Sequence, residues 1–350
     1  MNYHENLGNF KNNKLLGLGT KILSSGVFLP KQSVTSVDIF DAFHSEKNYG
    51  IEKTWMVDKM GIIERRVSDT RCSPSELAIS AAEQAIANYD GRIDEIDAVI
   101  FCGIERDQPE PATAHEIQKK LGLSAGFAFD IGNACFGFFD AIRVASSLIE
   151  SKSARSALIV TGEVMSRVTE ELVEQLKKGI PVKDAYNKMG FISCGDAGAA
   201  MIIGESGDGG YSGFTSFDLK TISNCNDLCY FDNTKGELEA QMKMAKIVAK
   251  TWNLQKEILT EAQKEKNWEA PKYLLTHQVG KKAFEQVADF GLVPQERMIK
   301  SYDYFGNVTS ATLGLNYHQL ITSHKLKQGE VVRACYSGSG IVAGQLSMRI

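Results

Sequence analysis

The stretch Asp130-Ile-Gly-Asn-Ala-Cys-Phe-Gly-Phe-Phe-Asp140 decides the fold, because it joins an apolar strand to a helix through a turn of small residues. Residues 126–129 before it are strand-like, and residues 141–149 after it place apolar side chains at helical spacing. This turn puts Cys135 at or near a helix N-terminus, where free N–H groups and the helix dipole favour a thiolate. Cys135 is therefore a candidate nucleophile. The alternative is a buried structural cysteine, since free cysteine is among the most buried residue types.

Length and composition indicate an ordinary globular protein. The chain has 350 residues, 43% hydrophobic and 23% charged, which suits two domains or one fold made of two halves. A net charge of −4 gives no indication of nucleic-acid binding. No apolar run approaches the length of a membrane span, and residues 1–13 form an expected polar tail without signal-peptide features. The seven scattered cysteines favour free thiols in a reducing cytoplasm.

Predicted strands alternate with predicted helices along the chain, which is typical of an α/β fold with parallel pairing. Buried strands are expected at 97–103 and 157–162, and amphipathic helices at 75–89 and 114–121. Residues 168–188 are expected to form a polar, partly helical insertion.

The two halves of the chain repeat each other. A strand at 98–102 precedes Gly132-Asn133, and a strand at 273–277 precedes Gly306-Asn307 at nearly the same offset. A helix and a further strand follow each Gly-Asn turn. Two similar halves related by a pseudo-dyad bring these turns towards each other, so residues at the two turns are predicted to share one site.

Three residues at three elbows of the chain fit a thiol enzyme. Cys135 can take an acyl group from a thioester and form a covalent acyl-enzyme. A neutral His277 Nε2–H and an Asn307 side-chain N–H are suitable donors to an enolate oxygen. Backbone N–H groups at Cys135 and in the closing turn Ser337-Gly-Ser-Gly340 are candidates for an oxyanion hole. The alternatives are that His277 is a hydrogen-bonded core histidine and that Asn307 only tolerates a left-handed turn.

Six motifs in order resemble β-ketoacyl-ACP synthase III and its relatives in the thiolase superfamily, and the resemblance spans roughly residues 15–350. The motifs are Trp55-Met-Val-Asp-Lys-Met-Gly-Ile-Ile-Glu-Arg65, Asn133-Ala-Cys135 with Gly137, Gly195-Asp-Ala-Gly198, His277-Gln278, Gly306-Asn307 with Thr309, and Ser337 to Gly344.

The resemblance implies a five-layered αβαβα thiolase-like fold made of two pseudo-dyad-related halves, and a homodimer. The expected boundaries are a tail at 1–13, an N-terminal half at 14–210 with the nucleophile, and a C-terminal half at 211–350 with His277 and Asn307. No metal and no cofactor is implied, because CoA or acyl-carrier-protein (ACP) thioesters are the substrates.

By the same resemblance, Cys135 is acylated from an acyl-CoA or acyl-ACP, with backbone N–H groups of Cys135 and Ser339 as the oxyanion hole. His277 and Asn307 then promote decarboxylation of a malonyl-type thioester, whose enolate attacks the acyl-enzyme and gives a β-ketoacyl thioester. The product belongs to fatty-acid or secondary-metabolite synthesis.

The CoA or pantetheine contacts implied by the resemblance are Trp55, Lys59 and Lys282. The resemblance implies that Trp55 stacks on the adenine of CoA; the alternative is that Trp55 is only a packing residue. Lys59 replaces a common arginine without its planar face. Lys281 and Lys282 form either a solvated face or a docking patch for an acidic carrier protein. Glu105 to Pro111 lacks the aromatic residue that often closes the acyl pocket, which indicates a longer or unusual acyl chain.

Two other functions stay open at this point. One keeps the acylation of Cys135 but transfers the acyl group to an alcohol or amine. The other is a partner subunit of a heteromeric synthase. Presence of both His277 and Asn307 favours condensation, because simple transfer has less need of enolate donors.

Overall fold

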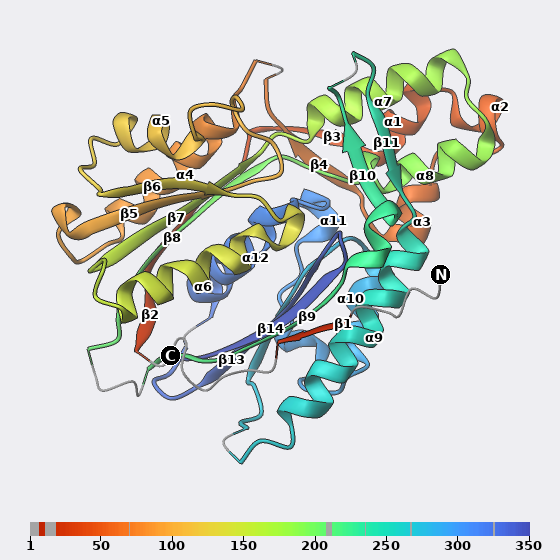
Figure 1. The fold of residues 1–350 in the computed structure, drawn as a ribbon. Helices are drawn as coiled ribbons and strands as arrows, with labels where there is room; N and C mark the ends of the chain where they lie inside the picture. The colour runs from red at the N-terminus through yellow and green to blue at the C-terminus, as the bar shows by residue number, and fades with distance from the viewer. Residues whose placement is uncertain are drawn as a thin grey trace, which may run out of the picture.

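The computed structural model describes residues 7–10, 19–69, 71–207, 212–234, 236–266, 268–324 and 326–350, and its frame is a pair of five-stranded sheets (Figure 1). The first sheet, in the order β2-β8-β7-β5-β6, contains β2 (Thr20–Phe28), β5 (Ile96–Cys102), β6 (Phe127–Ile131), β7 (Ser156–Glu163) and β8 (Ala197–Glu205). The second sheet, in the order β1-β9-β14-β13-β12, contains β1 (Leu7–Phe10), β9 (Gly213–Ile222), β12 (Tyr273–Thr276), β13 (Val331–Gly338) and β14 (Val342–Arg349).

Helices separate and cover the two sheets (Figure 1). The middle layer contains α6 (Gly137–Glu150) and α12 (Thr312–Ser323). The outer layers contain α4 (Pro74–Ala87) with α5 (Thr113–Lys120) on the first sheet, and α9 (Met244–Ala262) with α10 (Lys281–Ala288) on the second. This arrangement confirms the predicted five-layered αβαβα fold. Among the described residues, no helix is both long and apolar enough to cross a bilayer.

Strand pairing follows the predicted internal repeat. In the first sheet β5 runs parallel to β7, which runs antiparallel to β8. In the second sheet β12 runs parallel to β13, which runs antiparallel to β14. The helices α6 and α12 occupy equivalent positions between these strands, so the two Gly-Asn turns that precede them face the same end of the molecule.

The N-terminal segment differs from the expectation. Leu7–Phe10 lies within the tail predicted for residues 1–13, yet it forms β1 and pairs antiparallel with β9. An exposed edge strand offers a row of free N–H and C=O groups, and β1 covers that edge of β9. Four residues of the predicted tail are therefore a strand of the second sheet.

Close packing fixes α4 on the first sheet. A Cβ added at Gly162 would lie 1.8 Å from the carbonyl oxygen of Pro74, and one added at Gly198 would lie 2.1 Å from that of Leu77. Ser73 and Glu76 form a capping box that starts this helix where it meets the strands. Only glycine fits such a close approach, so Gly162 of β7 and Gly198 of β8 determine how near α4 lies to the first sheet.

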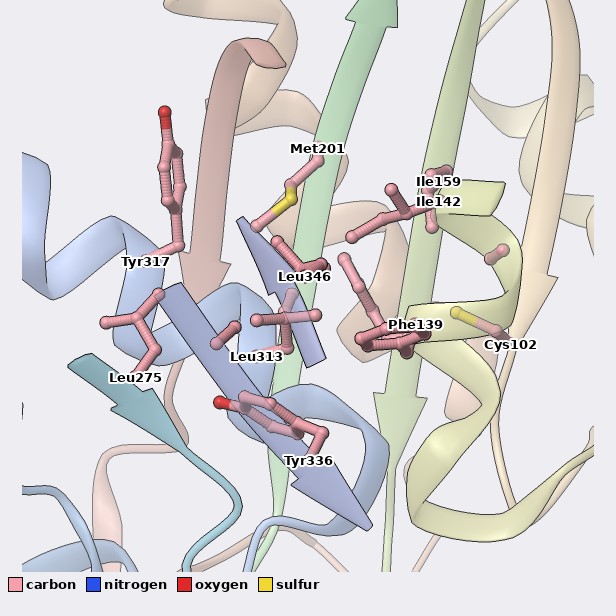
Figure 2. Packing of buried hydrophobic residues seen from close by; sticks show 14 of the residues in the cluster. Cys102, Phe139, Ile142, Ile159, Met201, Leu275, Leu313, Tyr317, Tyr336 and Leu346 are labelled. Carbon is pink, nitrogen blue, oxygen red and sulfur yellow. The ribbon is translucent and has the colours of Figure 1, made fainter. Parts of the chain in front are cut away.

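The main apolar core lies between the sheets, where both copies of the repeat contribute (Figure 2). Phe139 and Ile142 of α6 share this space with Met201 of β8, Leu313 of α12 and Leu346 of β14. These side chains are buried, and they hold the middle helices against both sheets. The same core fixes the N-terminal ends of α6 and α12, which carry the site.

Smaller elements gather at one side of the layers (Figure 1). They are β3 (Gln32–Thr35), β4 (Glu64–Val67), α1 (Ser36–Ala42), α2 (Ser45–Tyr49), α3 (Trp55–Met60), α7 (Ser166–Lys178), α8 (Val182–Ile192), β10 (Cys229–Asp232), β11 (Glu239–Met242) and α11 (Tyr302–Phe305). The polar insertion expected at 168–188 is thus two helices. Leu172 and Leu176 bury one face of α7, which explains why this polar segment is ordered.

Candidate active site

Cys135 lies in the 3-10 turn η2 (Ala134–Phe136), directly before α6. The Nδ2 group of Asn133 donates a hydrogen bond to Asp140 Oδ2 at 2.6 Å, which ties this turn to the first turn of α6. Ala134 has a φ of +47°, in the left-handed region that non-glycine residues adopt rarely. The structure therefore confirms the predicted place of Cys135 at a helix N-terminus.

The ionisation state of Cys135 differs from the sequence expectation. Burial raises the pKa of the Cys135 thiol well above its usual value, and nearby Cys194, Cys229 and Glu163 raise this pKa further. Desolvation of the charged form thus outweighs the helix dipole. The expectation that the turn by itself favours a thiolate is wrong, and acylation of Cys135 needs a group that takes its proton.

His277 follows β12 and provides a neutral imidazole. Its backbone N–H donates to the Cys335 carbonyl oxygen at 3.1 Å, which fixes the residue beside β13. Burial lowers the pKa of His277 to about 4. Its Nδ1 atom has no hydrogen-bond partner among the described residues, so the alternative of a hydrogen-bonded core histidine does not fit. A neutral ring can accept a proton or donate one N–H at neutral pH.

The depressed pKa of His277 predicts an acid-sensitive contribution to folding. The unfolded chain binds a proton below about pH 6.5, whereas folded His277 does so only near its pKa of about 4. The contribution of His277 to stability is therefore fully present above the pKa of the unfolded chain, about 6.5, and is lost as the pH falls towards the pKa of the folded protein, about 4. On going from pH 7.5 to pH 5, the unfolding free energy of the wild type should fall, and that of His277→Gln should fall by about 1–2 kcal/mol less. Urea unfolding at both pH values measures this difference.

The control for this prediction is His115→Gln, because His115 is exposed on α5. It should leave the pH dependence of unfolding unchanged. An equal effect of both substitutions, or no effect of His277→Gln, would contradict a buried neutral imidazole.

Asn307 is fixed by backbone hydrogen bonds to a segment more than one hundred residues away in sequence. Its N–H donates to the Ser193 carbonyl at 3.0 Å, and its carbonyl accepts from Gly195 N–H at 3.1 Å. Its side-chain Oδ1 accepts from Thr309 N–H at 3.0 Å. With Oδ1 occupied, Nδ2 is the polar group left to donate towards a substrate.

The Gly-Asn turn needs its glycine, not a left-handed asparagine. Gly306 has a φ of +66°, and a Cβ there would lie 2.5 Å from the Ser193 carbonyl oxygen. Asn307 is not among the described residues with positive φ. The alternative that Asn307 serves only as a left-handed turn residue is therefore excluded.

A single cavity of about 460 Å³ brings the predicted site residues together. Cys135, His277, Asn307 and Ser339 all line it. Its size is that of a small-molecule site. Most of its remaining wall is apolar and comes from β10, β11, α8, α9 and α10: Phe191, Phe231, Met242, Met244, Ile247, Val248, Trp252, Ala283 and Val287.

Sequence reasoning missed the apolar wall and three further thiols, those of Cys194, Cys229 and Cys335. Cys194 and Cys335 are buried side chains that line the cavity. Burial raises the pKa of Cys229, another lining residue, to about 11, against an opposing hydrogen bond with Ser339. The available signal was the run of methionine and aromatic side chains between residues 229 and 252.

A second hollow of about 660 Å³ adjoins the cavity. The two share residues of β11, α9 and α10, among them Met242, Val248 and Ala283. Its other lining residues include the predicted CoA contacts Trp55, Lys59 and Lys282, with Lys183, Lys243, Lys246 and Lys281. We call this hollow the lysine mouth.

The lysine mouth combines one aromatic wall with several unpaired cations. The Trp55 ring stacks on Phe40, with centroids 6.2 Å apart, and meets Tyr186 edge-on at 6.1 Å. Lys59 and Lys282 have no carboxylate partner within the part of the chain that the structure describes, unlike Lys243 and Lys281. Free ammonium groups beside an aromatic wall suit a phosphorylated, nucleotide-like ligand.

The family comparison covers both halves of the site. The family described as 3-Oxoacyl-[acyl-carrier-protein (ACP)] synthase III matches residues 129–223, and its C-terminal counterpart matches residues 262–350. Together these matches cover more than half of the chain; the first includes Cys135, and the second includes His277 and Asn307. The beta domain of class II histocompatibility antigen also matches residues 215–272. That segment contains most of β9, which pairs with β14 inside the second sheet.

Curated relatives match over nearly the whole chain. Beta-ketoacyl-[acyl-carrier-protein] synthase III of Bacillus pumilus is 25% identical and covers 94% of this chain and 98% of its own. The protein of the same name from Wolbachia pipientis is 28% identical, again over 94% of this chain and 98% of its own.

Solved structures with the same fold include OleA of Xanthomonas campestris. One OleA variant has a TM-score of 0.88 at 21% identity and covers 97% of this chain and 100% of that chain. Another, solved with bound lauric acid and lauroyl-CoA, has a TM-score of 0.87 over 95% of this chain and 99% of that chain. With a thiolase-like fold, the matched family motifs and relatives of full length, the chain belongs to the β-ketoacyl-ACP synthase III family of the thiolase superfamily.

Proposed function

We propose that this protein transfers an acyl group from a CoA or ACP thioester to Cys135 and then condenses it with a malonyl or β-keto thioester. The observation that carries the proposal is the single cavity that Cys135, His277 and Asn307 line together, with the lysine mouth adjoining it. The substrates themselves supply the reactive thioesters, so the proposed reaction needs no cofactor or metal.

In the loading step, Cys135 Sγ attacks the thioester carbonyl. The thiol proton passes to the neutral imidazole of His277 and then to the departing thiolate of the carrier. Backbone N–H groups at Cys135 and Ser339 are the proposed donors to the carbonyl oxygen as it gains charge. Because burial holds the pKa of Cys135 high, this proton transfer is part of the step rather than a prior event.

In the condensation step, the malonyl carboxylate leaves as carbon dioxide and its bonding electrons form an enolate. The enolate oxygen accepts hydrogen bonds from the His277 N–H and from Asn307 Nδ2. Both donors are uncharged, and the apolar cavity favours loss of a charged carboxylate. The enolate carbon then attacks the acyl carbonyl on Cys135, the carbon–sulfur bond breaks, and a β-ketoacyl thioester is released. The departing Cys135 thiolate takes up one proton from water, which restores the thiol.

The apolar wall supports an alkyl chain as the acyl group. Phe231, Met242 and Trp252 line the same cavity as the thiol, and methionine side chains adapt to chains of different shape. OleA, which has the same fold, was solved with bound lauric acid and lauroyl-CoA. We therefore propose an unbranched acyl chain of medium or greater length as the first substrate.

Product analysis tests the proposed reaction. The purified protein is incubated with acyl-CoA or acyl-ACP and a malonyl thioester, and the products are identified by mass spectrometry. A β-ketoacyl thioester longer by two carbons than the acyl donor supports condensation. Formation of an ester or amide with an added alcohol or amine, without loss of carbon dioxide, would support acyl transfer instead. The homodimer implied by the family stays a prediction. Strand β6 is an edge of the first sheet, and an edge strand can pair with a second copy of the chain.

The lysine mouth predicts a binding effect that is separate from chemistry. We expect Lys59→Glu and Lys282→Glu to raise KM for an acyl-CoA about three- to tenfold while kcat stays within about twofold, because each reverses a charge beside the phosphate groups. The rise should shrink as salt is added. Steady-state kinetics at two ionic strengths measure the effect.

The control for the lysine mouth is Lys120→Glu on α5, on the outer face of the first sheet. Its KM should equal that of the wild type. A change in kcat without a change in KM in the mouth variants would contradict a role in substrate binding.

A further inference from the structure

A buried carboxyl group lies behind the Asn307 turn and has no part in the mechanism above. Glu163 ends β7 and has no exposed surface. Its Oε1 accepts from Ser310 N–H at 3.2 Å, and both carboxyl oxygens lie 3.3 Å from Ile104 N. Its carboxyl also contacts Ser310 Oγ. Within the described part of the chain, no lysine or arginine forms an ion pair with Glu163.

The contacts of Ser310 decide which form of Glu163 fits. Besides Glu163, Ser310 Oγ lies 3.0 Å from the Cys102 carbonyl oxygen and 2.6 Å from Thr161 Oγ1. A serine hydroxyl has one proton, and a carbonyl oxygen only accepts. If Ser310 donates to an ionised Glu163, the Cys102 carbonyl loses this donor.

A protonated Glu163 satisfies the three hydroxyl contacts of Ser310. The carboxyl O–H donates to Ser310 Oγ, Ser310 donates to the Cys102 carbonyl, and Thr161 donates to Ser310. In agreement with this count of protons, burial raises the pKa of Glu163 to about 7, against the opposing hydrogen bonds. A buried ionised carboxylate without a cation would also be costly.

The network connects directly to the catalytic amide. Ser310 follows Thr309, whose φ of +48° is unusual for a β-branched residue. The N–H of Thr309 donates to Asn307 Oδ1 at 3.0 Å. Strained backbone of this kind persists only where its surroundings hold it. Glu163 holds it from behind, through both the N–H and the hydroxyl of Ser310.

We propose that Glu163 is a positioning residue that works in its protonated form and, through Ser310 and Thr309, keeps the Asn307 carboxamide directed into the cavity. The role assigned to Asn307 rests on the proposed function above. Glu163 would thus contribute to the condensing reaction without contacting the substrate.

The proton on Glu163 also affects the nucleophile. The titratable groups that interact with Glu163 are thiols: Cys102 of β5, Cys135 of η2 and Cys194 before β8. A negative charge on Glu163 disfavours a thiolate at each of them. Ionisation of Glu163 is thus expected to loosen the Asn307 turn and to oppose formation of the Cys135 thiolate.

The test compares the decarboxylation of a malonyl thioester across pH in three proteins. In the wild type, kcat should fall as the pH rises through about 7, where Glu163 loses its proton. Glu163→Gln keeps the length and stays neutral, so it should lose this fall and retain kcat at pH 6 within about threefold. Glu163→Asp is one methylene shorter and should lower kcat about tenfold or more, with KM unchanged. Thermal unfolding confirms that each variant is folded.

Alkylation of Cys135 by iodoacetamide gives a second readout that needs no condensation activity. In Glu163→Gln the rate should rise at lower pH than in the wild type, because the nearby negative charge is gone. The matched control is Glu105→Gln: Glu105 forms an ion pair with Arg167 at 3.0 Å and has no contact with Ser310. This control should keep the wild-type alkylation profile.

Three outcomes would overturn the positioning role. They are an unchanged pH profile in Glu163→Gln, a loss of kcat in Glu163→Gln as large as in Glu163→Asp, and an equal shift of alkylation in Glu105→Gln. An absence of decarboxylation in the wild type would instead overturn the proposed function, and the alkylation profiles would then decide by themselves whether Glu163 carries the proton.

Discussion

Replacing Asn307 by alanine is expected to separate the two half-reactions. Cys135 should still take an acyl group at nearly the wild-type rate, whereas decarboxylation of the malonyl thioester should fall about 10²- to 10³-fold, the usual cost of removing one donor to a developing oxyanion. The reason is geometric: Oδ1 of Asn307 is held by Thr309, so its free Nδ2 group is available for the enolate but not required for the thiol.

Two rates measure this separation. Intact-protein mass spectrometry follows acyl loading, and release of carbon dioxide from a malonyl thioester follows decarboxylation. The control is Asn88→Ala, because Asn88 donates to the Ser25 carbonyl at 3.2 Å and lies outside the cavity. Equal loss of loading and decarboxylation in Asn307→Ala would contradict the assigned role and indicate a collapsed site.

Replacing Cys135 by alanine should abolish acyl loading altogether. Three other thiols line the same cavity, those of Cys194, Cys229 and Cys335. Only Cys135 combines a helix N-terminus with a place in the cavity beside His277. We therefore expect no mass gain in Cys135→Ala with any acyl thioester.

Cys229→Ala is the matched comparison, because it removes a half-buried thiol from the same cavity. It should still take up one acyl group per chain. An acylated Cys135→Ala protein would show that another thiol is the acceptor and would contradict the assignment of the nucleophile.

The sequence predicted the meeting of Cys135, His277 and Asn307 because two periodic signals agreed. A predicted apolar strand lies at nearly the same offset before each Gly-Asn dipeptide and a predicted helix follows it, so the two dipeptides mark equivalent points of the repeat. Such local patterns can be recognised in the sequence without knowing which distant segments are in contact. The resemblance then supplied the layered arrangement that local patterns leave open.

What the sequence did not predict depends on contacts between distant segments. The raised pKa of Cys135 follows from burial in a cavity whose wall is built by β10, β11 and α9, far along the chain. The contact between Glu163 and Ser310 joins residues 147 positions apart, so no local pattern marks it. Glu163 at the carboxyl end of a buried strand was the one visible hint, since ligand sites favour such strand ends.

The most direct test of the account is a pulse and chase on the wild-type protein, followed by intact-protein mass spectrometry. The protein is first loaded from a panel of acyl-CoAs and the matching acyl-ACPs, and a malonyl thioester is then added. We expect a mass gain of one acyl group that disappears on the chase, with a β-ketoacyl thioester released. No gain from either carrier, or an acyl group that stays on the protein after the chase, would contradict a condensing enzyme.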